Sequence, residues 1–195
     1  MKLQVALLAA GRSDRYGSNK LLAPHRRSRQ PLLQHVLERY RQAGLFPIQV
    51  LTGCWHHPLQ GALQDQPDIA VHYVTNWQEG IAASLREAAQ LISANDESLL
   101  IGLGDQAGVT TELLQSLVNL YASRPVITAT VCNGIISPPV IFPYHERAIL
   151  QQLQGDKGAG KTLQQLADTA PERIQLLTVS SLIDIDCPDD WLKLD

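Results

Sequence analysis

The chain has 195 residues, of which 45% are hydrophobic and 18% are charged, and its net charge is −3. This length suits one domain with a sizeable core, and the composition is that of a globular protein. The small negative charge, without a basic block, argues against a broad nucleic-acid interface. No apolar run approaches the ~20 residues of a membrane span, and no signal-peptide pattern opens the chain, so we expect a cytoplasmic protein.

Strand-like and helix-like patterns alternate along the chain. Strands are predicted over residues 4–9, 48–51, 71–74, 99–103, 126–131, 140–142 and 174–179. Helices are predicted over residues 32–44, 81–92, 110–122, 145–153 and 161–166, with a last helical turn around Trp191. Continuous apolar strands between amphipathic helices predict an α/β fold with a mainly parallel sheet covered on both faces, as a single domain over residues 1–195.

The segment after the first predicted strand is the most distinctive part of the sequence. Between Gly11 and Lys20 it combines two glycines with three basic side chains, those of Arg12, Arg15 and Lys20. Glycines let backbone N–H groups approach an anion closely, and lysine and arginine neutralise phosphate oxygens. The segment therefore predicts a loop that binds a polyphosphate, and a nucleoside triphosphate is the expected ligand.

Further polar residues follow later strands of the predicted sheet. Asn76 and Gly80 come after the third strand, and Asp105 comes after the fourth. Ligands of such sheets bind outside the carboxyl ends of the strands. We therefore expect these residues to share one cleft with the loop of residues 11–20.

Five segments, spread from the first strand to the C-terminus, carry recognisable motifs. They are Leu8–Pro24 (LAAGxSxRxGxxKxLxP), Asn76–Leu85 (NxxxGxxxSL), Gly104–Gln106 (GDQ), Leu153–Ala159 (LxGDxGA) and Asp184–Asp190 (DIDCPDD). In this order they resemble the motifs of the MobA/MocA-like nucleotidyltransferase family, and within it the molybdenum cofactor cytidylyltransferase and guanylyltransferase branch. The resemblance implies a three-layer, Rossmann-like nucleotidyltransferase fold.

The chain departs from the family's motifs in three places. Tyr16 stands where a methionine is usual, and Ala107 stands where the proline of GDxP is usual. Ser137–Pro139 stands where the branch generally has GHP or GNP. The last two departures border the acceptor side as the family places it, so they bear on the acceptor rather than on the fold.

The resemblance implies a transfer reaction in which the phosphate of a small acceptor attacks the α-phosphate of a nucleoside triphosphate and pyrophosphate leaves. It implies a molybdopterin-type acceptor and, as a partner, a molybdoenzyme or its chaperone, with neither nucleic acid nor membrane involved. Residues 9–11 read AAG, which accompanies pyrimidine nucleotides in the family, whereas AGG accompanies guanine nucleotides. Ala9 and Ala10 therefore favour CTP. Mg²⁺ is the expected cofactor, since it prefers carboxylate and phosphate oxygens.

The resemblance also implies roles for individual residues. Lys20, Arg15 and Asp105 are the expected catalytic residues, and Asp105 and Asp186 are the expected metal ligands. Asp184 remains an alternative to Asp186, because residues two apart on a strand point the same way. The residues expected at the nucleotide are Leu8, Ala9, Ala10, Gly11, Arg12, Lys20, Asn76, Gly80, Ser84 and Asp105, and those expected at the acceptor are Pro139, Gly155, Asp156 and Lys157.

Two other functions compete with this one. Gly155–Thr162 matches the P-loop pattern GxxxxGK[ST], which predicts a kinase or NTPase. A working P-loop needs a buried strand directly before it, whereas residues 148–154 have apolar positions at helical spacing, so the family reading is favoured. The departures at Ala107 and Ser137–Pro139 motivate the second alternative, a non-catalytic accessory protein that binds nucleotide.

Histidines and cysteines carry weaker signals. Trp55–Pro58 (WHHP) is predicted to be a solvated loop rather than a metal site, because no third ligand is evident. Cys54, Cys132 and Cys187 form no CxxC pair, so we expect three reduced, buried, small side chains.

Overall fold

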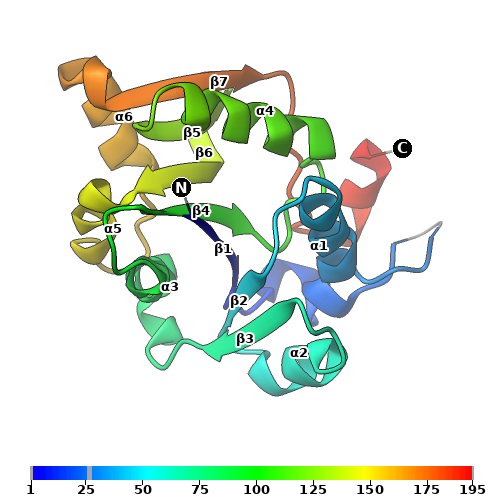
Figure 1. The fold of residues 1–195 in the computed structure, drawn as a ribbon. Helices are drawn as coiled ribbons and strands as arrows, with labels where there is room; N and C mark the ends of the chain where they lie inside the picture. Colours follow the sequence, from blue (N-terminus) through cyan, green and yellow to red (C-terminus); the bar gives the residue numbers. More distant parts are fainter. Residues whose placement is uncertain (1, 26–27, 195) are drawn as a thin grey trace.

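The structure, a computed structural model, describes residues 2–25 and 28–194. A seven-stranded sheet in the order β3-β2-β1-β4-β6-β5-β7 runs through the middle of the molecule (Figure 1). The strands are β1 (Lys2–Ala9), β2 (Ile48–Thr52), β3 (Ile69–Tyr73), β4 (Glu97–Leu103), β5 (Ile127–Cys132), β6 (Ile135–Pro143) and β7 (Ile174–Val179). β6 runs antiparallel to β4 and β5, and the other neighbours are parallel. The expected mainly parallel sheet is confirmed.

Helices cover both faces of the sheet, which gives the expected three layers. They are α1 (Leu32–Gln42), α2 (His56–Leu63), α3 (Ile81–Ala88), α4 (Thr111–Ser123), α5 (Ala148–Gln151) and α6 (Gly160–Thr169). Short 3-10 turns are η1 (Asp14–Tyr16), η2 (Lys20–Leu22), η3 (Trp77–Glu79), η4 (Ala89–Leu91), η5 (Tyr144–Glu146), η6 (Pro171–Arg173) and η7 (Pro188–Lys193). Buried side chains of α1, α2 and α4 form one core, and those of α3, α5 and α6 form the other (Figure 1). In the described part of the chain, no helix combines the length and apolar character that crossing a membrane requires.

Local sequence explains where α4 begins and which face it buries. Thr110 precedes the helix, and its side-chain oxygen accepts a hydrogen bond from the backbone N–H of Leu113 at 3.2 Å. This cap satisfies one of the free N–H groups at the helix start. Leu114, Leu117 and Tyr121 recur at helical spacing and are buried. Their spacing therefore fixes the face that α4 turns toward the sheet.

Two elements differ from the sequence prediction, and both differences have a physical cause. α2 lies partly in the segment expected to be a solvated loop, and its Leu59 and Leu63 are buried four residues apart. Burial of these side chains outweighs the poor helix propensity of the sequence around Pro58. β6 contains Pro138 and Pro139, but the register between β5 and β6 shifts at this point, so the prolines lie outside the regular ladder.

A buried carboxylate joins the starts of β1 and β4. Glu97 accepts hydrogen bonds from the Lys2 ammonium at 2.7 Å and from the backbone N–H groups of Ser93 and Ala94 at 2.7 and 3.2 Å. The bond from Lys2, followed by those from the backbone, lowers the pKa of Glu97 to about 2. Glu97 therefore ties the loop before β4 to the first strand of the sheet.

Candidate functional site

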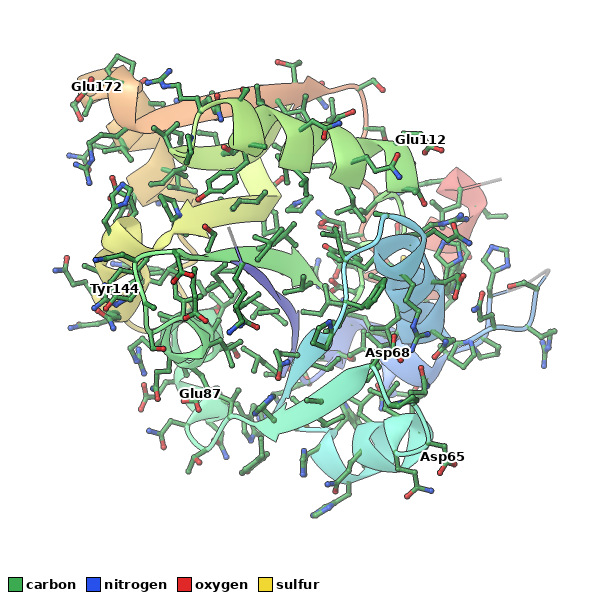
Figure 2. All side chains as sticks on the ribbon, viewed as in Figure 1. Asp65, Asp68, Glu87, Glu112, Tyr144 and Glu172 are labelled. Carbon is green, nitrogen blue, oxygen red and sulfur yellow. The ribbon has the colours of Figure 1, made fainter. Side chains whose placement is uncertain are left out.

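A cleft of about 650 Å³ opens where β1 and β4 end. Of the residues that the sequence singles out, twelve line it: Leu8, Ala9, Ala10, Gly11, Arg12, Arg15, Lys20, Gly80, Ser84, Asp105, Asp156 and Asp186. This position agrees with the rule that ligands of parallel sheets bind at the carboxyl ends of the strands. In Figure 2, by contrast, the labelled acidic side chains Asp65, Glu87, Glu112 and Glu172 lie around the outside of the molecule.

The opening loop, residues 10–20, folds back over the cleft through two left-handed residues. Ser13 has φ 62° and Gly17 has φ 76°, and η1 lies between them. The backbone N–H of Gly17 donates to the carbonyl of Ser13 at 3.2 Å, which closes the turn. A positive φ is uncommon for a residue other than glycine, and residues in such strained conformations cluster at functional sites. The turn places Arg15 over the cleft, where its Nη1 lies 2.9 Å from Oδ2 of Asp186.

Lys20 occupies the centre of a small charge cluster. Its Nζ lies 2.6 Å from Oδ2 of Asp105 and 3.0 Å from Oδ1 of Asp186. Only 13% of the Lys20 side chain is exposed, and that burial lowers its pKa, but the two carboxylates raise the pKa by more, so Lys20 stays protonated. Two carboxylates thus converge on one point of positive charge.

A short backbone ladder brings Asp105 and Asp186 together from distant parts of the chain. The N–H of Gly108 donates to the carbonyl of Ile183 at 2.9 Å, and the N–H of Ile185 donates to the carbonyl of Asp105 at 3.0 Å. A Cβ on Gly108 would lie 2.6 Å from the backbone nitrogen of Ile183, so only glycine permits this approach. Ile185 is fully buried. In an extended segment the side chains of its two neighbours, Asp184 and Asp186, point the opposite way, out of the core.

The structure distinguishes Asp186 from Asp184, which the sequence left open. Asp186 lines the cleft and pairs with both Lys20 and Arg15. Asp184 lies outside the cleft lining and keeps an exposed surface. Loss of water around its carboxyl, together with the negative charges of Asp105 and Asp186, raises the pKa of Asp184 to about 6. Asp186, and not Asp184, is therefore the carboxylate that shares the Lys20 ammonium with Asp105.

Asp190 holds the backbone that carries Asp186, and sequence reasoning missed it. Its buried carboxylate accepts hydrogen bonds from the N–H groups of Asp186 and Cys187, both at 2.8 Å, and from Lys193 Nζ at 2.6 Å. The bond from Lys193, followed by those from the backbone, holds the pKa of Asp190 well below its usual range. Cys187 and Asp190 are three residues apart, which is the spacing of a capping box, but cysteine is an unusual first residue for one.

The C-terminal segment lies against the opening loop and α1, as Figure 1 shows for the red segment near the end of the chain. The Trp191 indole N–H donates to the hydroxyl of Tyr16 at 3.4 Å, and the His25 ring meets Trp191 edge-on at 4.8 Å. Tyr16, the residue that replaces the family's usual methionine, therefore joins the opening loop to the segment that carries Asp186.

The acceptor-side residues divide into two groups. The carbonyl of Gly155 accepts from the N–H of Ala82 at 3.2 Å, and the carboxylate of Asp156 lies 3.5 Å from the N–H of Ile81, so this loop caps α3. Gly80 has φ 104°, and a Cβ there would lie 2.7 Å from the Cα of Asp156. The other acceptor-side residues are not among those that line the cleft: Gly155 itself and Lys157, which are exposed, and Pro139, which is buried in β6. Asn76, which was expected at the nucleotide, is also exposed and outside the cleft lining, so the expectation that it shares the cleft is wrong.

Trp77 lines the cleft, and the sequence prediction missed it. It occupies a variable position of the NxxxGxxxSL segment, so the motif gave no signal for it. A Cβ on Gly53 would lie 2.6 Å from the Trp77 ring and 2.6 Å from the carbonyl oxygen of Ala10. Gly53 therefore lets the indole ring pack close behind the opening loop.

The P-loop prediction is wrong, because the structural context of that motif is absent. Residues 148–151, which precede the motif, form α5 instead of a buried strand. Lys157 and Lys161 are exposed, and the cleft described above lies at the ends of other strands. The match of Gly155–Thr162 to the pattern is therefore a coincidence of sequence.

Two expectations for histidines and cysteines need correction. Residues 56–58 begin α2, so WHHP is not a simple solvated loop, although His57 is exposed. Cys54 is exposed, and Cys132 and Cys187 are half-buried, so the expectation of three buried thiols is wrong. Cys54 directly follows the tightly packed Gly53, where the chain turns outward.

Sequence comparisons identify relatives over most of the chain. The pattern of the MobA-like NTP transferase domain matches residues 5–170. The bifunctional protein GlmU of Staphylococcus epidermidis is 25% identical over 138 residues, which cover 71% of this chain and 30% of that protein. The chain thus spans less than a third of the length of this curated relative.

Solved structures resemble the whole chain. Rv0371c from Mycobacterium tuberculosis H37Rv is 27% identical with a TM-score of 0.77, and the match covers 100% of this chain and 97% of that one. A complex of Rv0371c with manganese gives 24% identity, a TM-score of 0.75 and coverages of 100% and 98%. CMP:2-keto-3-deoxy-manno-octonic acid synthetase in complex with CTP has the same fold, with 16% identity, a TM-score of 0.73 and coverages of 100% and 97%.

Proposed function

Because the chain belongs to the family of MobA-like NTP transferase domains, we propose that it is a nucleotidyltransferase that uses a nucleoside triphosphate. An oxygen of the acceptor's phosphate attacks the α-phosphorus, the bond from the α-phosphorus to the oxygen bridging to the β-phosphate breaks, and pyrophosphate leaves. The acceptor supplies the nucleophile, so no protein nucleophile is needed. The single observation that carries the proposal is the convergence of Lys20, Asp105 and Asp186 in a cleft at the ends of β1 and β4.

The donor set at this point fits a divalent metal ion. The oxygens of Asp105 and Asp186 already meet around one cationic atom, Nζ of Lys20, and carboxylate oxygens are the ligands that Mg²⁺ prefers. In the described part of the chain no group of three or more histidine, cysteine or acidic side chains forms a metal site, so phosphate oxygens and water would complete the shell. The manganese complex of Rv0371c supports divalent metal use. When bound, the ion would neutralise charge on the reacting phosphates.

Lys20 and Arg15 would neutralise the remaining phosphate charge. Lys20 presents a compact ammonium from the wall of the cleft, and Arg15, with 78% of its side chain exposed, can swing to meet the triphosphate. Positive groups that are already in place stabilise charge that develops on the leaving pyrophosphate. The catalytic contribution of these residues is therefore electrostatic and positional.

Backbone groups of the opening loop would hold the nucleoside. Ala9, Ala10 and Gly11 line the cleft, and Ser84, buried on α3, lines it from the facing helix. The alanine pair favours CTP, and the relative solved with CTP has the same fold. We propose a molybdopterin-type acceptor whose phosphate enters the cleft near Asp156, with a molybdoenzyme or its chaperone as the receiver of the product.

A nucleotide panel tests this function. With Mg²⁺ and a pterin-phosphate acceptor, CTP should release pyrophosphate faster than GTP, ATP or UTP, and Lys20→Ala should abolish the release. Lys161→Ala is the matched control, because Lys161 is the lysine of the rejected P-loop motif and should be dispensable. Orthophosphate release that depends on Lys161 would contradict the proposal. Tight CTP binding without turnover on any acceptor would indicate the accessory protein instead.

A further inference from the structure

A second hollow adjoins the cleft on the far side of Trp77. It has a volume of about 540 Å³ and is lined by Gly53, Cys54, His56, His57, Pro58, Tyr73, Trp77 and Gln78, of which Trp77 and Gln78 also line the cleft. We call it the histidine hollow. The cleft carries the charged cluster of Lys20, Asp105 and Asp186, whereas this lining consists of rings, one amide, one thiol and backbone. The two cavities therefore suit different parts of a ligand.

Flat rings form much of the wall of the histidine hollow. The rings of His56 and Tyr73 lie 5.0 Å apart at 52°, and those of His56 and His57 lie 5.2 Å apart at 58°. Tyr73 is 47% exposed, which is a large open surface for an aromatic side chain at the end of a strand. Exposed rings of this kind pack favourably against another planar ring.

The hydrogen bonds of His56 fix which of its ring nitrogens carries the proton. The buried Thr52 hydroxyl donates its single proton to the carbonyl of His72 at 2.9 Å. The same oxygen lies 2.7 Å from Nδ1 of His56, so Nδ1 must be the donor in that contact. The neutral imidazole is therefore the Nδ1–H tautomer, and its Nε2 is an acceptor. Because His56 lines the hollow, its ring adds one hydrogen-bond acceptor to the flat walls.

The wall of the histidine hollow is also tied to the opening loop. The N–H of Cys54 donates to the carbonyl of Ala10 at 3.2 Å, and the indole N–H of Trp55 donates to the carbonyl of Arg12 at 2.9 Å. The loop that lines the cleft and the segment that begins α2 are therefore one connected unit. A ligand part in the hollow would lie against the back of the loop that holds the triphosphate.

We propose that the histidine hollow binds a planar, uncharged heterocycle with an N–H or amino donor, as the ring of a substrate other than the nucleotide. The ring stacks on the aromatic wall and donates a hydrogen bond to Nε2 of His56. The inference rests on the proposed function, in which the cleft itself holds the nucleoside between the opening loop and α3. A pterin has the required planarity and N–H donors.

Protection of Cys54 tests this proposal directly, because its exposed thiol lines the histidine hollow. Neopterin, a pterin without phosphate, should slow alkylation of Cys54 by iodoacetamide saturably, as followed by mass spectrometry of the cysteine peptides. Cys132 and Cys187 serve as internal references and should react at unchanged rates. Myo-inositol, a polyol without an aromatic ring, should not protect Cys54. Mg–CTP alone should leave the Cys54 rate unchanged.

A variant pair isolates the acceptor nitrogen. His56→Phe keeps a flat ring but removes Nε2, and it should weaken neopterin binding roughly tenfold, the effect of one lost hydrogen bond. His145→Phe, an exposed histidine on η5 outside both cavities, is the matched control and should bind neopterin normally. Nitrogen NMR of the free protein should show His56 as the Nδ1–H tautomer.

Three outcomes would overturn the proposal: full protection of Cys54 by Mg–CTP with no effect of neopterin, no protection by either compound, or an Nε2–H tautomer of His56. Failure of the proposed function has a different signature. In that case Mg–CTP would not raise the melting temperature of the protein, whereas protection by neopterin would still report on the histidine hollow.

Discussion

Replacing Lys20 with methionine should change metal binding and nucleotide binding in opposite directions. In the protein without ligand, the Lys20 ammonium holds the oxygens of both Asp105 and Asp186, at 2.6 and 3.0 Å. A divalent ion that binds between these carboxylates must first displace the ammonium. Methionine has a similar length and no charge, so Lys20→Met should leave the carboxylate pair open to the ion.

The magnitude follows from the two contacts. A hydrogen bond to a charged group contributes about 1.5–3 kcal/mol, and the partial exposure of Asp105 and Asp186 argues for the lower end. Recovering ~2 kcal/mol should tighten Mn²⁺ binding to the nucleotide-free protein roughly 30-fold. The same substitution removes a cation from the triphosphate site, so kcat/KM should fall by about 100-fold or more.

Electron paramagnetic resonance of free Mn²⁺ measures the metal affinity, calorimetry with CTP measures the nucleotide affinity, and steady-state pyrophosphate release measures kcat/KM. Arg15→Gln is the matched control, because Arg15 is 78% exposed and, among residues 2–25 and 28–194, forms an ion pair with Asp186 and not with Asp105. Exposed pairs contribute about 0.2–1 kcal/mol, so this variant should shift Mn²⁺ affinity only a few-fold. If Lys20→Met weakens Mn²⁺ binding, or leaves both affinities unchanged, the reasoning about the charge cluster is refuted.

Four further predictions concern residues that support the site and the sheet. Asp190→Asn removes the carboxylate that accepts from the backbone of Asp186, so Mn²⁺ affinity should fall about tenfold, and unchanged affinity in calorimetry would exclude this role. Gly102→Ala should lower the free energy of unfolding in urea by about 3 kcal/mol or more, because its Cβ would lie 1.9 Å from the Tyr40 hydroxyl, and wild-type stability would show that the site relaxes freely. Tyr40→Phe should unfold at equal or higher urea concentration than wild type, since this buried hydroxyl has no partner in the described part of the chain. Glu97 contributes stability above its ordinary pKa of about 4.5, and this contribution is lost as the pH falls toward its folded pKa of about 2, so Glu97→Gln should flatten the melting temperature over that range.

Sequence patterns predicted the layers of the fold well, because the central parallel strands β1, β2 and β4 are mostly buried and read as continuous apolar runs. They could not predict that β6 runs antiparallel. Prolines in the middle of a segment argue against a strand, because they cannot donate a ladder hydrogen bond. In β6 the register with β5 shifts at Pro138 and Pro139, so the strand pairs on either side of them. α2 was missed for a related reason, since two buried leucines within eight residues give too short a periodic signal.

The candidate site was predicted in part. Lys20 and Asp105 follow strands that are neighbours in the sheet, so the carboxyl-end rule brings them to one place. Asp186 follows β7, which lies at the edge of the sheet and not beside β4, so the ladder through Gly108 and Ile185 is what places it next to Asp105. Contacts of this kind depend on tertiary structure, and the same is true of Asp190, whose partners are backbone N–H groups.

The fate of the α-phosphorus decides whether the protein transfers a nucleotide. CTP labelled at the α-phosphate would be incubated with the protein, Mg²⁺ and the pterin-phosphate acceptor, and the labelled products separated. The label should move to the acceptor while one pyrophosphate is released for each transfer. Label retained in CDP with release of orthophosphate, or label that never leaves CTP while the acceptor is bound, would refute nucleotidyl transfer.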